Sequence, residues 1–219
     1  MTGIGRFRPV TPERLVDELA THALQPRPDG WTRVAVDGAP AAEPGVLADR
    51  LAEAFRDRGR AVLRVSAADF LRPASVRLER GRTDADEYYD GWLDVSALHR
   101  EVLGPLQPGG AGEVLPRLWN PATDRSYRAE RVALPPRAVL VLDGPLLLGR
   151  RLAVELAVHL ALSEGALERR TPEPLRWTLP AFDRYRREVD PERVADVVVR
   201  WDHPSHPAIS WRTATAAGG

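Results

Sequence analysis

The stretch from Arg33 to Phe55, RVAVDGAPAAEPGVLADRLAEAF, has the order of parts that makes a phosphate-binding loop: an apolar strand, a loop and an amphipathic helix. In such a loop, backbone N–H groups hold phosphate, a lysine reaches the outer phosphates, and a Ser or Thr hydroxyl holds Mg²⁺. Counting the spacing G-x-x-x-x-G-K-[ST] from Gly38 places Glu43 at the second glycine, Pro44 at the lysine and Gly45 at the hydroxyl. The fingerprint is therefore only half present.

The residues that replace the fingerprint oppose polyphosphate binding. Pro40 and Pro44 have no N–H to donate, and Glu43 places a carboxylate where a phosphate would lie. We expect Glu43 to accept hydrogen bonds from the first N–H groups of the following helix and so to imitate the phosphate that it excludes. The alternative is that this loop simply connects a strand to a helix.

Lysine and cysteine are both missing from the sequence, so all 31 Lys and Arg residues are arginines. Arginine stays protonated and does not act as an amine nucleophile. Without cysteine there are no disulfides, thiolate nucleophiles or Cys-based metal sites. His203 and His206 lie in a Pro-rich segment without further ligands, so we expect no metal site.

Two further carboxylates follow apolar strand patterns. Asp69 comes shortly after GRAVLRVS, and Asp143 ends the run AVLVLD. The carboxyl ends of parallel strands border the ligand crevice of an α/β sheet, so Asp69 is a candidate for chemistry, and we expect Asp143 near the same edge of the sheet. For Asp69, the alternative is a helix cap or a turn residue.

The elements that must position these residues alternate between strand and helix. Thr11 to Leu24 has a Thr N-cap and a Pro at the first helical position, which predicts a leading helix. The alternation predicts an α/β fold with an open parallel sheet. The expected strands are Val34–Val36, Val62–Val65, Val139–Leu142, Ala157–Leu160 and Val197–Val199.

Length and composition set the domain organisation and exclude some function classes. With 219 residues, 43% of them hydrophobic, we expect a helical extension over residues 1–30, one α/β domain over 31–210 and a flexible tail over 211–219. A net charge of zero argues against a nucleic-acid or anionic-membrane partner. The sequence shows no membrane-length apolar run and no signal-peptide core, so we expect a cytoplasmic protein.

From about Val34 to Ile209, the chain resembles the uridine kinase branch of the P-loop nucleoside kinases. The motifs that carry the resemblance are VAVDG, VSAADFLRP, DADEYYDGWLDVSALHREVLGPLQPGG, VLVLDGPLLL and YRREVDPERVADVVVRWDHPSHPAI. The resemblance implies a P-loop kinase-like α/β fold: an open parallel five-stranded sheet in the order 2-3-1-4-5 with helices on both faces. It also implies ATP and Mg²⁺ as cofactors, whereas the loop residues argue against both.

The resemblance also implies roles for particular residues. Asp69 matches the base that acts on the nucleoside 5′-hydroxyl, and Ala68 occupies the other acidic position of that motif. Arg72 matches an arginine on the substrate side. Asp143 matches the residue that organises magnesium or water near the phosphates.

Two further groups of residues correspond to binding elements of the family. Tyr88, Tyr89 and Trp92 would supply a stacking face for a base, although such residues are also common in ordinary packing. The segment ALERRTPEPLRW corresponds to the lid that clasps phosphates, which makes Arg169, Arg170 and Arg176 the candidate anion contacts.

Together these features favour a uridine kinase-like protein with a dismantled ATP site. Such a protein would bind a nucleoside, a nucleotide or another small ligand, or a partner protein, in a non-catalytic or regulatory role. The alternative is an active phosphotransferase that holds phosphate with arginines and uses Asp69 as base. That enzyme would need arginine side chains in the crevice to offset Glu43. A third alternative is a scaffold without a ligand.

Overall fold

The computed structural model describes residues 5–25 and 30–212 of the chain. Within them, no helix has the length and apolar character that a membrane span requires. The expected tail lies outside the described residues from position 213 onward. Its first residue, Trp211, still belongs to strand β11, Ala208–Trp211.

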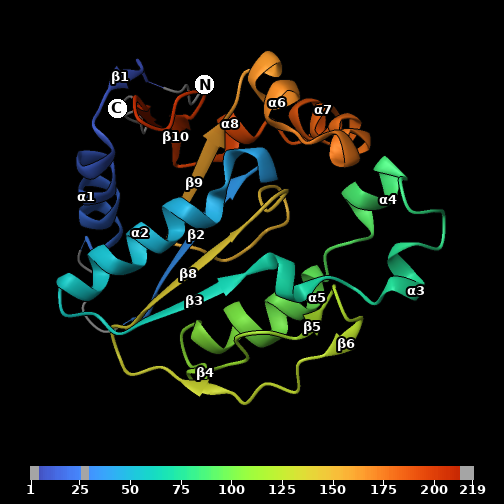
Figure 1. Cartoon of the computed structure of the whole chain (residues 1–219). Helices are drawn as coiled ribbons and strands as arrows, with labels where there is room; N and C mark the ends of the chain where they lie inside the picture. Colours follow the sequence, from blue (N-terminus) through green and yellow to red (C-terminus); the bar gives the residue numbers. More distant parts are fainter. Residues whose placement is uncertain (1–4, 26–29, 213–219) are drawn as a thin grey trace, which may run out of the picture.

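One seven-stranded sheet organises the structure, in the order β1-β11-β10-β9-β2-β8-β3 (Figure 1). Its five parallel strands are β2 (Thr32–Gly38), β3 (Val62–Ser66), β8 (Val139–Gly144), β9 (Leu156–Ala161) and β10 (Val197–Arg200). Numbered along the chain, these five lie in the order 2-3-1-4-5. They contain the five predicted strand segments, so the predicted α/β fold is confirmed.

Two antiparallel strands extend the sheet beyond β10. Strand β11 pairs with β10, and the short strand β1, Arg8–Pro9, pairs with β11. Neither strand was expected from the sequence, because β1 is only two residues long and β11 follows the Pro-rich segment that contains both His203 and His206. The segment before residue 31 therefore contributes to the same sheet as the rest of the chain.

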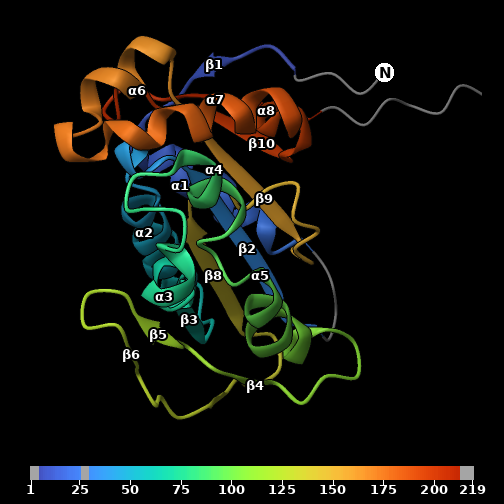
Figure 2. The ribbon, with the colours of Figure 1, turned by 90° about the vertical axis from the view of Figure 1, so that its right-hand side faces the viewer.

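Helices cover both faces of the sheet. Helices α1, Pro12–Ala23, and α2, Pro44–Asp57, pack on one face. The other face is covered by the continuous helical segment of α5, Val95–Ala97, and η3, Leu98–Leu103 (Figure 2). The alternation of side chains along β8 divides its apolar residues between these two cores.

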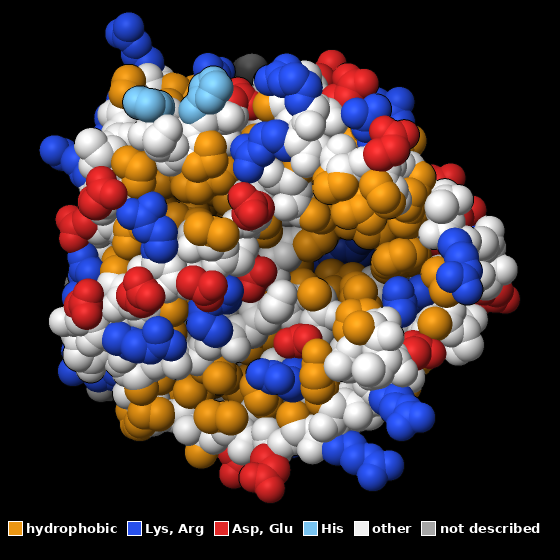
Figure 3. All heavy atoms as spheres, in the orientation of Figure 1, with side chains coloured by type: hydrophobic (Ala, Val, Ile, Leu, Met, Phe, Trp, Pro, Cys, Tyr) orange, Lys and Arg blue, Asp and Glu red, His pale blue; other side chains and the backbone are white. Residues whose placement is uncertain are grey.

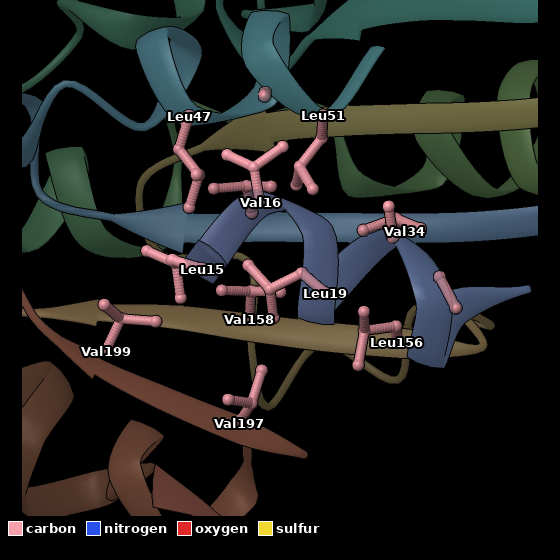
Figure 4. Close-up of a cluster of buried hydrophobic side chains, with 14 of the residues drawn as sticks. Leu15, Val16, Leu19, Val34, Leu47, Leu51, Leu156, Val158, Val197 and Val199 are labelled. Atoms are coloured by element: carbon pink, nitrogen blue, oxygen red, sulfur yellow. The ribbon is translucent and has the colours of Figure 1, made fainter. Parts of the chain in front are cut away.

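The first core forms around helix α1. Thr11 caps this helix by accepting a hydrogen bond from the Arg14 N–H, which fixes its start. Leu15 and Leu19, four residues apart on one face, are fully buried beside Leu47 and Leu51 of α2 and the valines of the sheet (Figure 4). Burial of large aliphatic side chains of this kind stabilises a fold by about 1.5–3 kcal/mol each.

A third cluster of helices lies beyond the carboxyl ends of the strands (Figure 1). It consists of α4 (Ala85–Asp90), α6 (Glu164–Arg170), η5 (Glu173–Thr178) and α7 (Leu179–Glu188). Asp84 caps α4 and Ser163 caps α6 through side-chain acceptors. These helices and the ends of the strands together surround the candidate site.

The remaining elements are short connections. They are η1 (Pro40–Ala42), η2 (Ala67–Phe70), α3 (Ala74–Arg77), η4 (Gly104–Leu106), β4 (Glu113–Val114), β5 (Trp119–Asn120), β6 (Arg125–Ser126), β7 (Val132–Ala133) and α8 (Pro191–Val194). Strands β4 and β7 form one antiparallel pair, and β5 and β6 form another. Both pairs lie between residues 107 and 138, where no strand was expected from the sequence.

Candidate ligand-binding site

The loop after β2 closes on itself instead of presenting its N–H groups to a phosphate. The Ala42 N–H donates to the Ala39 carbonyl oxygen at 2.8 Å, and the Glu43 N–H donates to that of Pro40 at 3.0 Å. Pro40 and Pro44 supply no N–H. The amide groups on which a phosphate-binding loop depends are therefore missing or already bonded at these four positions.

The two glycines of this loop have packing roles in the structure. A Cβ atom at Gly38 would lie 3.1 Å from the Leu160 Cβ, so this glycine lets β2 and the loop approach β9 closely. A Cβ atom at Gly45 would lie 3.4 Å from the Asp143 Oδ2. The position where a phosphate-binding loop carries its hydroxyl thus faces the carboxylate at the end of β8, but it has no side chain.

The expectation that Glu43 caps helix α2 and imitates a phosphate is wrong. Glu43 has a left-handed backbone, with φ 51° and ψ 56°, and its side chain makes no capping hydrogen bond. A capping side chain normally reaches the helix amides from extended backbone, which explains the failure. The Glu43 carboxylate is instead 68% exposed and lies 3.9 Å from the Arg170 Nη2. Arg170 also donates from Nη1 to the Trp201 carbonyl oxygen.

The carboxylate of Asp143 is neutralised by a side chain from the neighbouring strand. The Arg64 Nη2 lies 2.8 Å from the Asp143 Oδ1, while the Arg64 Nε bonds Asp49 and its Nη1 bonds the Val141 carbonyl oxygen. Burial raises the pKa of Asp143, and the Arg64 charge opposes that rise. Three acceptors therefore hold a guanidinium beside the carboxylate that the resemblance assigns to magnesium.

The residues present do not fit Mg²⁺ or a nucleoside triphosphate. Asp143 already has a cationic partner, and Gly45 and Pro44 stand where a hydroxyl and a lysine would be required. Across residues 5–25 and 30–212, no group of three or more His, Cys, Asp and Glu side chains is arranged to hold a metal ion.

Asp69 lies just beyond β3 but its side chain is directed to a neighbouring hairpin. A hydrogen bond to the Asp69 carboxylate raises the pKa of the Tyr127 phenol, and the Asp69 carbonyl oxygen accepts the Leu118 N–H at 3.0 Å. Ala68, rather than Asp69, lines the neighbouring cavity. The structure thus places an apolar methyl group on the cavity wall beside the candidate base.

Two cavities adjoin the loop and share Pro40, Tyr88 and Trp92 in their walls. The first, of about 300 Å³, lies between the loop, the residues after β3 and the segment after β8. The second, of about 480 Å³, lies between the loop and the η5–α7 segment. In Figure 3 a hollow on this side of the molecule is rimmed mainly by hydrophobic side chains, with a basic side chain at its floor.

An aromatic cluster forms the wall that the two cavities share. The ring centroids are 5.1 Å apart for Tyr88 and Trp92, and 5.5 Å apart for each of these residues with Trp177. Burial raises the pKa of Tyr88 to about 12, so its phenol stays neutral. The Trp92 Nε1 is buried without a hydrogen-bond partner among the described residues. These contacts fix the rings before any ligand arrives.

The other aromatic candidate has a different location. Tyr89 is buried against Tyr185 of α7, with 6.4 Å between ring centroids, and lines neither cavity. The structure therefore brings Tyr88 and Trp92 to the site and places Tyr89 in the core. Trp177 also belongs to the site, although it was not among the residues expected from the sequence. The only sequence signal for Trp177 was its position within the expected lid.

The remaining basic candidates lie outside the two cavities. Arg72 is half-buried, and its main-chain N–H donates to the Trp92 carbonyl oxygen at 2.8 Å. Arg169 is exposed on α6, and Arg176 pairs with Glu173 at 3.0 Å. Of the three expected lid arginines, only Arg170 lines a cavity.

A buried polar network holds the site's elements together. Asp37, fully buried at the end of β2, accepts hydrogen bonds from the Leu147 N–H at 2.8 Å and from the Tyr185 hydroxyl at 3.2 Å. Its other partner is the His159 Nδ1 at 2.7 Å. The Tyr185 hydroxyl also accepts the Leu148 N–H, and burial followed by the Asp37 charge raises the pKa of this phenol. The network joins β2, β9, α7 and the segment after β8.

The sequence matches no family model and no curated protein sequence. Among solved structures, the chain is similar to a possible uridine kinase from Bacillus stearothermophilus, with 21% identity, a TM-score of 0.67 and coverage of 84% of this chain and 96% of the other. A second structure, provisionally described as a fructose transport system kinase from Silicibacter sp. TM1040, has 22% identity and a TM-score of 0.57, with coverage of 81% of this chain and 89% of the other. The YGR205w protein has 8% identity and a TM-score of 0.61, with coverage of 94% of this chain and 100% of the other. The chain therefore has a P-loop kinase-like fold.

Proposed function

We propose that this protein is a kinase-like small-ligand-binding protein that does not use ATP. The observation that carries the proposal is the closed loop after β2. The Ala42 and Glu43 N–H groups bond within the loop, and two prolines remove further donors. Phosphate transfer depends on positioning and charge stabilisation at the phosphates, and this loop supplies neither.

The charges around Asp143 support the same conclusion. A catalytic magnesium ion would have to displace the Arg64 guanidinium from a buried carboxylate that it neutralises at 2.8 Å. The guanidinium cannot lose its proton under physiological conditions, so the pair persists across the working pH range of an enzyme. Arg64 therefore acts as a fixed internal counter-charge where the resemblance calls for a metal ion.

The ligand side of the site is better preserved than the ATP side. Both cavities are lined mainly by apolar and aromatic side chains, with a few polar groups, which is the usual composition of a small-molecule site. A nucleoside or nucleotide is the first class to test, because Tyr88 and Trp92 provide an aromatic wall for a base. The role would be sensing or regulation.

The alternative function is a phosphotransferase with an arginine-based phosphate site. The observation that favours it is the approach of Arg170 to Glu43, at 3.9 Å, which partly offsets the carboxylate. Against it, Arg170 is already bonded to Trp201, and the candidate base Asp69 accepts a hydrogen bond from Tyr127. The non-catalytic function agrees better with both contacts.

A ligand screen separates the two functions. Thermal shift with ATP, GTP, uridine, cytidine and their monophosphates, each with and without Mg²⁺, should show no stabilisation by ATP·Mg²⁺. A parallel assay should show no transfer of the ATP γ-phosphate to uridine or cytidine. Magnesium-dependent stabilisation by ATP together with phosphate transfer would establish the phosphotransferase and overturn the proposal.

A further inference from the structure

Arg150 is a basic residue in the wall of the first cavity with no acidic partner among the described residues. Its Nε donates to the Leu146 carbonyl oxygen at 2.7 Å, and its Nη2 donates to that of Tyr89. No described residue accepts a hydrogen bond from its Nη1. The guanidinium is therefore held in place by neutral carbonyl groups and keeps both its full charge and a donor for a ligand.

The segment that carries Arg150 has a constrained backbone. Leu146 and Arg151 have positive φ angles of 59° and 55°, which side-chain-bearing residues adopt at a cost in free energy. The buried Asp37 and Tyr185 hold the intervening N–H groups. The fold thus fixes the position of the arginine through a network whose members, Asp37 and Tyr185, do not line the cavity.

The other charges that line the two cavities have nearby partners. Asp143, in the wall of the first cavity, pairs with Arg64 at 2.8 Å. Glu43, in the wall of the second cavity, lies 3.9 Å from Arg170. Among the described lining residues, Arg150 therefore carries the one positive charge that no carboxylate balances.

The chemistry of the walls restricts the class of anion. A single guanidinium balances one negative charge, whereas a polyphosphate carries several charges and needs several donors. A carboxylate matches one arginine edge in both charge and geometry. Tyr88 and Trp92 supply flat apolar surface in the same cavity, which favours a planar ring as the remainder of the ligand.

We propose that the first cavity binds a small aromatic carboxylic acid, with the carboxylate at Arg150 and the ring against Tyr88 and Trp92. This inference rests on the proposed ligand-binding function and names the class of ligand. The cavity volume of about 300 Å³ accommodates a molecule with one ring system. Binding requires the ionised acid, so the corresponding neutral amide is the matched comparison.

The test uses three acid and amide pairs as probes: benzoate, phenylacetate and indole-3-acetate, each against its amide. Isothermal titration calorimetry measures their affinities for the full chain at pH 7. Arg150→Gln removes the charge. Arg184→Gln is the control. The guanidinium carbon lies 5.9 Å from the Tyr89 ring centroid in Arg150 and 4.3 Å from it in Arg184. Arg184, however, pairs with acidic residues and lines neither cavity.

At least one acid should bind the wild-type chain about ten- to a hundredfold more tightly than its amide, as expected for a hydrogen bond to a charged group. Arg150→Gln should abolish this preference, and Arg184→Gln should retain it. Equal affinities for acid and amide, no binding of any of the three acids, or a preference that survives in Arg150→Gln would overturn the inference. The wild-type comparison decides the matter if Arg150→Gln does not fold.

These outcomes differ from those that would overturn the proposed function. Binding of uridine, cytidine or the neutral amides, without preference for the acids, would refute the anion site and leave a ligand-binding protein. Transfer of phosphate from ATP would refute the non-catalytic function whatever acids bind to Arg150.

Discussion

Replacing Arg64 with methionine tests the internal counter-charge at Asp143. The Asp143 side chain is only 10% exposed and the Arg64 side chain 21% exposed, so the substitution leaves a buried carboxylate without its cation. Breaking a fully buried pair in this way costs about 3–5 kcal/mol. Because solvent reaches part of Arg64, we expect Arg64→Met to lower the free energy of unfolding by about 2 kcal/mol at pH 7.

The pH dependence of this loss has a definite sign. Burial holds the folded-state pKa of Asp143 above the ordinary value of 3.8, and removal of the opposing Arg64 charge raises it further. The folded state then binds more protons than the unfolded state, so stability falls as pH rises from the unfolded pKa through the raised folded pKa. The loss in free energy of unfolding caused by Arg64→Met should therefore be largest at neutral pH and should decrease as the pH falls toward about 4.

Urea unfolding at pH 7 and pH 5 measures this effect for the wild type, Arg64→Met, Asp143→Asn and the double variant. The double variant should be less destabilised than the sum of the two single variants, because each removes the same interaction. Arg60→Met is the control, since the Arg60 side chain, just before the start of β3, has the Arg137 carbonyl oxygen as its sole hydrogen-bond partner among the described residues. Additive losses, or a loss that is equal at both pH values, would refute the internal counter-charge.

Two other substitutions test the structure around the loop. Asp37→Asn should lower the free energy of unfolding by about 3 kcal/mol, because a fully buried carboxylate with three hydrogen-bond partners loses its charge. A loss below about 1 kcal/mol in urea unfolding would contradict the stabilising role of this network. Glu43→Gly should leave stability unchanged or raise it by up to about 1 kcal/mol, since glycine accepts left-handed backbone and the exposed pair with Arg170 contributes little. In thermal and urea unfolding, a clear loss of stability in Glu43→Gly would show that the carboxylate supports the loop after all.

The sheet was predictable because its signal is repeated along the chain. Continuous apolar runs such as Val139–Leu142 are typical of strands covered on both faces, and the connecting helices restrict such strands to a parallel arrangement. The added strands β1 and β11 carry too little local pattern to be found in the same way. Their pairing depends on contacts between the two ends of the chain.

The charged partners of the site could not be predicted in this way. Arg64 and Asp143 are 79 positions apart in the chain, and their contact depends on which strands become neighbours. A charged residue inside the apolar pattern of β3 was the one local signal. Arg150 had no such signal, because its role depends on left-handed backbone at neighbouring residues and on the Asp37 network.

The failed expectation for Glu43 has a local physical cause. Its sequence position before a helix is favourable for a capping carboxylate, but the turn at Pro40–Ala42 brings the chain into left-handed backbone at that residue. The side chain then leaves the helix N-terminus and approaches Arg170. The missing lysine and hydroxyl at Pro44 and Gly45, in contrast, were readable directly from the sequence.

Calorimetric titration of ATP·Mg²⁺ into the wild-type chain and into a triple variant, Glu43→Gly, Pro44→Lys and Gly45→Thr, tests whether the residues of the loop after β2 exclude ATP. The variant restores the glycine, lysine and hydroxyl of a phosphate-binding loop, and Gly45 already faces Asp143. We expect no measurable binding to the wild type and measurable, magnesium-dependent binding to the folded variant. Micromolar, magnesium-dependent binding of ATP to the wild type would show that the closed loop does not exclude the nucleotide.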